Sequence, residues 1–152
     1  PSCWDIARTS STPGKTQHLN AFRFPAFYLL DLPGYGYAKL SLTERKRLRQ
    51  LIESTISQRA GLRAVVWLLD IRHPATDNDL AMGELLADAK RETIVVLTKS
   101  DTLTPSARIV AHRARAGELG IDPDELLMTS SSKGTGIPEL GELIAEVATE
   151  GL

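Results

Sequence analysis

Short apolar runs alternate along the chain with longer segments of helical periodicity. The run "RAVVWLLDI" is continuously apolar, which is typical of a parallel strand covered on both faces, and "ETIVVLTK" has the character of a second buried strand. The first two runs lie close together, with Pro25 at a tight connection between them. In all, the pattern predicts strands at residues 18–24, 26–32, 63–71, 92–99 and 125–131.

Four segments between or after these runs are predicted helices. In the first, residues 41–61, Ser41 and Glu44 form a capping box and Gly61 supplies the C-terminal stop. Its apolar residues recur at helical spacing, namely Leu48, Leu51, Ile52 and Ile56. The other helices are predicted at Asp77–Ala89, from Thr104 and Pro105 to Leu119 with Gly120 as the stop, and from Pro138 onward, where Leu140, Leu143, Ile144 and Val147 form one stripe.

This alternation of strands and helices predicts a doubly wound α/β fold built on a mostly parallel sheet. With 152 residues the chain is expected to form a single domain, residues 1–152. In such sheets ligands bind beyond the carboxyl ends of the strands, so the segments that leave the strands carry the candidate chemistry. These segments are "DLPGYGYA", "DIRHPATDND", "TKSD" and "SSSKGTG".

Composition narrows the possible classes of protein. The net charge of −1 excludes a broadly basic nucleic-acid binder but leaves local basic faces, such as residues 44–50 and the helix that carries Arg108, Arg113 and Arg115. The single cysteine fits a reducing compartment. No apolar run approaches the roughly 20 residues that a membrane-spanning helix needs. We therefore expect a cytoplasmic protein without a membrane association.

The stretch "SSTPGKTQ" contains the tripeptide Gly14-Lys15-Thr16, which ends a phosphate-binding loop of the pattern G-x-x-x-x-G-K-[ST]. The first glycine of that pattern is missing, because position 9 is Thr9. No buried strand leads into the stretch, and the residues after it alternate like a strand rather than a helix. The stretch is therefore not a phosphate-binding loop.

An apolar run ends in Asp31, and Gly34 follows three residues later, which gives the arrangement D-x-x-G. The aspartate can hold a water bound to Mg²⁺, and the glycine lets a backbone N–H approach a γ-phosphate. The alternative is an aspartate that caps a loop, followed by a Pro-Gly turn.

The segment "LTKSD" suits guanine recognition at the end of a buried strand. Asp101 can accept hydrogen bonds from both the N1–H and the exocyclic amine of guanine, a pair of donors that adenine lacks. Lys99 can lay its aliphatic stem over the base, while Thr98 braces the loop. The alternative is a helix start capped by Asp101 or Thr104.

The segment "TSSSKGTGI" would complete the base site from the other side. The small residues Ser130 and Ser131 let a backbone N–H reach the guanine O6, and Lys133-Gly134 fix the turn. Taken alone it is a loop rich in serine and glycine. The order D-x-x-G, T-K-x-D and S-S-x-K-G, each at a strand end, carries more weight than any one of the three motifs.

These motifs, together with "ARTSSTPGKTQ" and "DIRHPATDND", resemble the EngB family of bacterial ribosome-assembly GTPases from Ile6 onward. The resemblance implies a Ras-like P-loop GTPase G domain with a three-layer α/β/α architecture, which binds GTP or GDP with Mg²⁺. It makes "SSTPGKTQ" the switch I segment, with Thr16 as a direct Mg²⁺ ligand and Asp31 as a ligand through water. The GTP-binding residues that it implies are Gly14, Lys15, Thr16, Gln17, His18, Asp31, Leu32, Pro33, Gly34, Thr98, Lys99, Ser100, Asp101, Thr129, Ser130 and Ser131.

The sequence departs from that family at its beginning. The family's first strand and its G-x-x-x-x-G-K-S loop should precede Ile6, and "PSCWD" matches neither. We therefore expect an N-terminally truncated G domain in which two strands are left with unpaired edges. Tyr35 stands where many GTPases carry a water-orienting glutamine, and His18 and His73 are better explained as loop or strand-edge residues. No catalytic residue is assigned.

The resemblance also implies a function and partners: a monomer that acts in assembly of the large ribosomal subunit, contacts its RNA and is needed for normal cell division and septation. One alternative is a degenerate, non-hydrolysing G domain that keeps only a partner contact. Another is a flavodoxin-like or other doubly wound module in which the motif matches are accidental.

Overall fold

The computed structural model describes residues 20–35 and 40–150. Internal contacts divide the chain into two compact units, Pro1–Gln58 and Arg59–Leu152. The expectation of one domain over residues 1–152 stays a prediction.

The first unit contains a β-hairpin. Strand β1 (Asn20–Arg23) pairs antiparallel with β2 (Tyr28–Asp31), with Asn20 opposite Asp31. The connection at Pro25 is as tight as predicted, because the N–H of Phe24 donates to the carbonyl of Phe27 over 2.9 Å. Both strands are shorter than the predicted runs.

Helix α1 (Leu42–Gln58) completes the described part of this unit. The predicted capping box is confirmed: the N–H of Ser41 donates to Glu44 Oε2 over 2.9 Å, and the N–H of Glu44 donates to Ser41 Oγ over 3.2 Å. The predicted end at Gly61 is wrong. The helix ends three residues earlier because the N–H of Leu62 donates to the carbonyl of Arg59, which makes a separate turn of these residues.

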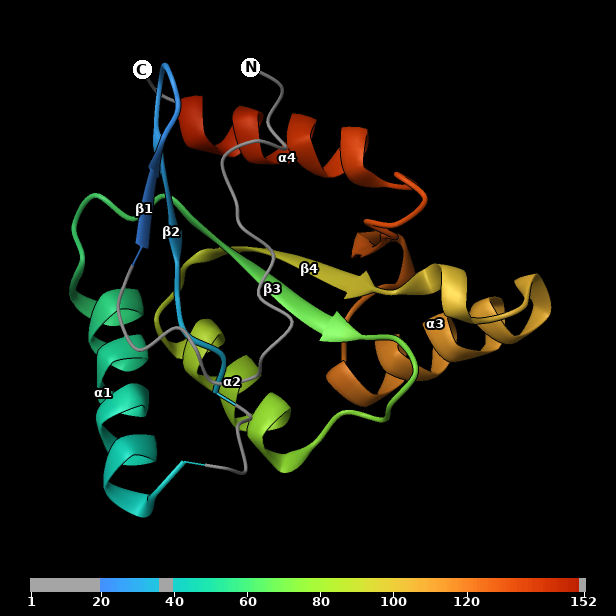
Figure 1. Cartoon of the computed structure of the whole chain (residues 1–152), viewed down its shortest axis with the longest axis horizontal. Helices are drawn as coiled ribbons and strands as arrows, with labels where there is room; N and C mark the ends of the chain where they lie inside the picture. Colours follow the sequence, from blue (N-terminus) through green and yellow to red (C-terminus); the bar gives the residue numbers. More distant parts are fainter. Residues whose placement is uncertain (1–19, 36–39, 151–152) are drawn as a thin grey trace. The chain divides into compact units, whose positions relative to one another are not determined.

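The second unit is a parallel sheet with helices on both faces. The strands β3 (Ala64–Asp70), β4 (Glu92–Thr98) and β5 (Leu126–Met128) pair in the order β3-β4-β5. Figure 1 shows α4 (Ile137–Thr149) on one face and α2 (Asp77–Asp88) and α3 (Pro105–Leu119) on the other. Two short 3-10 turns, η2 (Ser100–Thr102) and η3 (Pro123–Glu125), follow β4 and precede β5. The predicted three-layer α/β architecture is confirmed.

The core of this unit lies along β4, where Val96 and Leu97 have no exposed surface. Trp67 and Leu69 on β3 are also buried, but Leu68 between them is 57% exposed. The expectation that β3 is covered on both faces along its whole length is therefore wrong, because alternate residues of a strand point to opposite faces and the face that carries Leu68 is open at that position. Among the described residues β3 pairs only with β4, and β2 only with β1, which matches the unpaired edges expected from the sequence.

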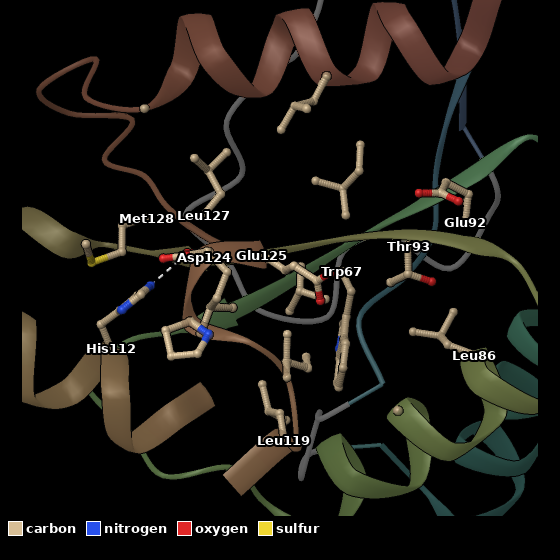
Figure 2. A pocket seen from close by; sticks show the side chains of 18 of the residues that line it. Trp67, Leu86, Glu92, Thr93, His112, Leu119, Asp124, Glu125, Leu127 and Met128 are labelled. Carbon is tan, nitrogen blue, oxygen red and sulfur yellow. Dashed lines mark hydrogen bonds between the residues drawn. The ribbon is translucent and has the colours of Figure 1, made fainter. Parts of the chain in front are cut away.

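A cavity of about 1290 Å³ is lined by the sheet and by α2, α3 and α4 (Figure 2). Its walls are mainly apolar side chains such as Trp67, Leu86 and Leu127, and one of its few polar contacts joins His112 Nε2 to the carbonyl of Leu126 over 2.7 Å. Helix α4 contacts β3 and β4, yet none of its side chains is fully buried. Of the predicted site residues that the structure describes, only Ser100 lines this cavity, so the cavity is not the predicted nucleotide site.

Candidate functional site

Segments from all three parallel strands meet at the carboxyl edge of the sheet. Asp70 at the end of β3 is in register with Thr98 at the end of β4. The hydroxyl of Thr98 donates to the carbonyl of Leu69 over 3.1 Å, which joins β4 to β3. The N–H of Ser100, a residue only 2% exposed, donates to the carbonyl of Thr129 over 3.0 Å, which joins the β4 loop to the segment after β5.

Asp101 is an exposed carboxylate held in place by two hydroxyls. Ser130 Oγ donates to its Oδ1 over 2.6 Å, and Ser132 Oγ donates to its Oδ2 over 2.9 Å. These bonds, that of Ser130 first, lower the pKa of Asp101 from its ordinary value. A carboxylate accepts about four hydrogen bonds, so each oxygen keeps a lone pair for a ligand. Asp101 does not cap helix α3; Thr104 does, through a bond from the N–H of Ala107.

Hydrogen bonds within the loop between β5 and α4 hold Ser130 in place. This residue is 1% exposed, its N–H donates to the carbonyl of Thr135 over 2.9 Å, and its Oγ accepts from the N–H of Lys133 over 3.2 Å. Gly134 and Gly136 have φ angles of 73° and 71°, which favour glycine. The loop therefore depends on two glycines to return the chain to α4.

Lys99 has an unusual backbone conformation at the centre of the β4 loop, with φ 61° and ψ 31°. Its carbonyl accepts bonds from the N–H and the hydroxyl of Thr102, over 3.1 and 2.7 Å. Its ammonium donates to Asp70 Oδ2 over 2.9 Å. The guanidinium of Arg72 also binds Asp70, and this bond, with that of Lys99, holds the pKa of the Asp70 carboxyl well below its usual range.

The other predicted site residues belong to the first unit. Asp31 is the last residue of β2 and is exposed, and Leu32, Pro33 and Gly34 follow it. Residues 14–18, which include Thr16, lie outside the described residues. Among residues 31–34, Asp31 supplies a carboxylate, a hard oxygen ligand that suits Mg²⁺. Within residues 20–35 and 40–150 there is no cluster of three or more His, Cys, Asp or Glu that could hold a metal by itself.

Sequence reasoning missed four residues of this site: Asp70, Arg72, Ser132 and Gly136. Two signals were available. Asp70 ends an apolar run just as Asp31 does, and Ser132 is the third serine of "TSSSKG". Ser131 follows Ser130 and is exposed. No sequence pattern shows that Gly136 faces the backbone of Met128.

Comparisons with known proteins agree with this geometry. Residues 3–99 match the family described as "50S ribosome-binding GTPase". The chain is 39% identical over 144 residues to the probable GTP-binding protein EngB of Syntrophomonas wolfei, an alignment that spans 94% of this chain and 74% of that protein. A crystal structure of a probable GTP-binding protein engB superposes with a TM-score of 0.77 at 19% identity, over 93% of this chain and 87% of that one.

A second solved structure, Era in complex with MgGDPNP and nucleotides 1506–1542 of 16S ribosomal RNA, superposes with a TM-score of 0.69 at 19% identity. The match covers 97% of this chain and 50% of that chain. At these identities both solved structures show the fold alone.

The parallel sheet, its helices on both faces and the T-K-x-D and S-S-x-K-G loops at its carboxyl edge define a Ras-like GTPase G domain. The chain belongs to the EngB family of GTP-binding proteins. This membership excludes the alternative of a flavodoxin-like module with accidental motifs. Over residues 20–35 and 40–150, no helix has the length and apolar character needed to span a membrane.

Proposed function

We propose that this chain recognises the guanine base of GTP and GDP through the loop that ends β4, with Asp101 as the specificity-determining residue. One observation carries the proposal: the Asp101 carboxylate is fixed by the hydroxyls of Ser130 and Ser132, which come from the loop after the neighbouring strand. A carboxylate held in this way is oriented before a ligand arrives, so a bound base need not order it.

Guanine offers two adjacent donors, N1–H and the 2-amino group, that match the two oxygens of Asp101. Adenine presents an acceptor at N1 and has no 2-amino group, so it would leave the carboxylate unpaired in the bound state. An unsatisfied polar group costs about 1–3 kcal/mol, and more when it is charged. Lys99 would lie over the base plane, Thr98 braces the strand end, and a backbone N–H near Ser131 would meet the guanine O6.

The residues that we propose to bind phosphate and Mg²⁺ belong to the first unit. Asp31 would hold Mg²⁺ through a water, Gly34 would approach the γ-phosphate, and Thr16 would bind the ion directly. Gly14, Lys15, Gln17 and His18 belong to the same proposed segment. Mg²⁺ would neutralise the phosphate charge during hydrolysis of GTP to GDP. The structure of Era in complex with MgGDPNP supports this part of the proposal.

The proposed role is in assembly of the large ribosomal subunit in the cytoplasm, by a monomer, with an effect on cell division and septation. The family description "50S ribosome-binding GTPase" supports the ribosomal partner, and the 16S RNA named with Era supports contact with RNA. Basic residues on α1, among them Arg45, Lys46, Arg47 and Arg49, offer charge for phosphate contacts.

A second candidate function is a G domain that binds its partner without hydrolysing GTP. The observation that favours it is Tyr35, which stands where many GTPases carry a glutamine that orients the attacking water. GTP hydrolysis measured with and without ribosomal subunits distinguishes the two functions.

The base assignment is tested by Asp101→Asn. We expect the affinity for GMP, measured by isothermal titration calorimetry, to fall more than about tenfold, because the amide offers a donor where guanine also donates. Xanthosine monophosphate should gain affinity, since its 2-oxo group accepts from that donor. The control is Asp88→Asn, which removes the same charge at the end of α2. Unchanged GMP affinity in Asp101→Asn contradicts the proposal.

A further inference from the structure

The loop that follows β4 carries Lys99 and Asp101, and these two side chains are held by residues on opposite sides of β4. Lys99 reaches toward β3, where its ammonium meets Asp70 Oδ2 at 2.9 Å. Asp101 reaches toward the loop after β5, where it accepts from Ser130 and Ser132. Because β4 lies between β3 and β5, the loop is held on both sides at once.

Asp70 is itself well ordered before it meets Lys99. Arg72 binds it in a forked arrangement, with Nε at 2.9 Å from Oδ1 and Nη2 at 2.6 Å from Oδ2. The backbone N–H of Arg72 also donates to Oδ1 over 3.0 Å. The Asp70 side chain is 22% exposed, whereas the Lys99 side chain is 54% exposed. The carboxylate is thus held by bonds that do not involve Lys99, and Lys99 is the more exposed partner.

Backbone geometry reinforces this arrangement. The register that sets Asp70 beside Thr98 brings the end of β3 within about 5 Å of the residue that precedes Lys99. The left-handed backbone of Lys99 is sterically costly for a residue with a side chain, and it sets the direction in which that side chain leaves the loop. The Lys99 side chain therefore runs from the loop after β4 to Asp70 at the end of β3.

We propose that Asp70 is a positioning residue for guanine-nucleotide binding, which holds the ammonium of Lys99 so that its stem is ready to cover the base. This inference rests on the proposed function of the Lys99–Asp101 loop. A lysine that is ordered in advance gives up less conformational freedom on binding. One such side chain corresponds to roughly a three- to tenfold gain in affinity.

The proposal assigns different tasks to the two aspartates. Asp101 reads the donor pattern of the base, whereas Asp70 acts only through Lys99. Loss of Asp70 should therefore lower the affinities for GMP and inosine monophosphate by the same factor, because inosine lacks only the 2-amino group, which Asp101 recognises. Loss of Asp101 should instead change the ratio of these two affinities.

The experiment compares Asp70→Asn, Lys99→Met and the double variant in the whole chain, by calorimetric titration with GMP and inosine monophosphate. We expect Asp70→Asn to weaken both ligands about three- to tenfold and to add nothing in the Lys99→Met background. Circular dichroism shows whether each variant stays folded, and Asp88→Asn is the charge-matched control.

The possible results separate this inference from the proposed function. If the unaltered chain binds GMP selectively and Asp70→Asn leaves that affinity unchanged or tighter, the inference is overturned while the proposed function stands. The inference is also overturned if Asp70→Asn lowers the GMP affinity of the Lys99→Met variant by the same factor as that of the unaltered chain, because Asp70 would then not act through Lys99. If the unaltered chain shows no preference for GMP over AMP, the proposed function fails and the inference fails with it.

Discussion

Gly136 tests whether the loop that presents Ser130 is held by backbone packing. Its φ of 71° is left-handed, and a Cβ built on it would overlap the carbonyl oxygen of Met128, which belongs to strand β5 and cannot swing aside. Gly136→Ala therefore combines backbone strain with a clash. Relief of the clash requires the loop to move and to loosen the bond from Ser130 N–H to the carbonyl of Thr135.

The expected cost follows from these two effects. A left-handed backbone costs a residue with a side chain about 1–2 kcal/mol. Loss of the buried hydrogen bond of Ser130 adds about 1–3 kcal/mol. We therefore expect Gly136→Ala to lower the free energy of unfolding by about 2–5 kcal/mol.

Two other glycines are matched controls for the same substitution. Gly134 has a φ of 73° but open space where a Cβ would lie, so Gly134→Ala should cost only the strain, about 1–2 kcal/mol. Gly141 lies inside α4, also with open space, so Gly141→Ala should stabilise the chain by about 0.5–1 kcal/mol.

The assay is urea unfolding followed by circular dichroism, together with GMP affinity at a urea concentration of zero. The expected order of stability is Gly141→Ala, the unaltered chain, Gly134→Ala and last Gly136→Ala. Gly136→Ala should also lower the affinity for GMP, because Ser130 would no longer orient Asp101. Equal stability of the Gly134 and Gly136 variants would refute the reasoning, since only one of them meets the β5 backbone.

Two further predictions concern β3. Leu69→Ala should destabilise the chain by about 2–5 kcal/mol, whereas Leu68→Ala should cost far less, because Leu68 is 57% exposed; similar urea midpoints for the two variants would contradict the assigned faces. The low pKa of Asp70 means that its charge stabilises the folded chain above its unfolded pKa of about 3.9 and that this contribution is lost as the pH falls through the lower folded value. The difference in thermal midpoint between the unaltered chain and Asp70→Asn should thus be constant near pH 6 and shrink below about pH 4; a constant difference down to pH 2.5 would disagree with the assigned pairing.

The sequence predicted the fold well where local chemistry decides it. The Ser41–Glu44 capping box and the Thr104 cap with Pro105 are local signals, and both helices begin where these predict. The predicted end of α1 at Gly61 was wrong because a glycine can either stop a helix or belong to a separate turn after it. The position of the glycine in the sequence does not distinguish these two cases. The burial of Leu68 depends on which elements pack against β3, and the sequence of the strand itself does not predict this.

The sequence motifs predicted the residues proposed to contact the base, but not the residues that hold them in place. Asp101 and Lys99 could be found because the T-K-x-D pattern follows a buried strand. Asp70 could not be linked to Lys99 from sequence, because that contact depends on strand order and register across 29 residues of chain. The same holds for Ser132, which meets Asp101 only because the β5 loop turns back at two glycines.

Recognition of guanine by Asp101, at the carboxyl edge of the β3-β4-β5 sheet, is tested by ¹⁵N–¹H correlation spectra of the labelled chain during parallel titrations with GMP and AMP. We expect saturable shifts with GMP at the amides of Ser100, Asp101 and residues 130–133, and none of comparable size with AMP. Equal shifts with both nucleotides, or GMP shifts confined to the walls of the cavity around Trp67 and Leu127, would contradict it.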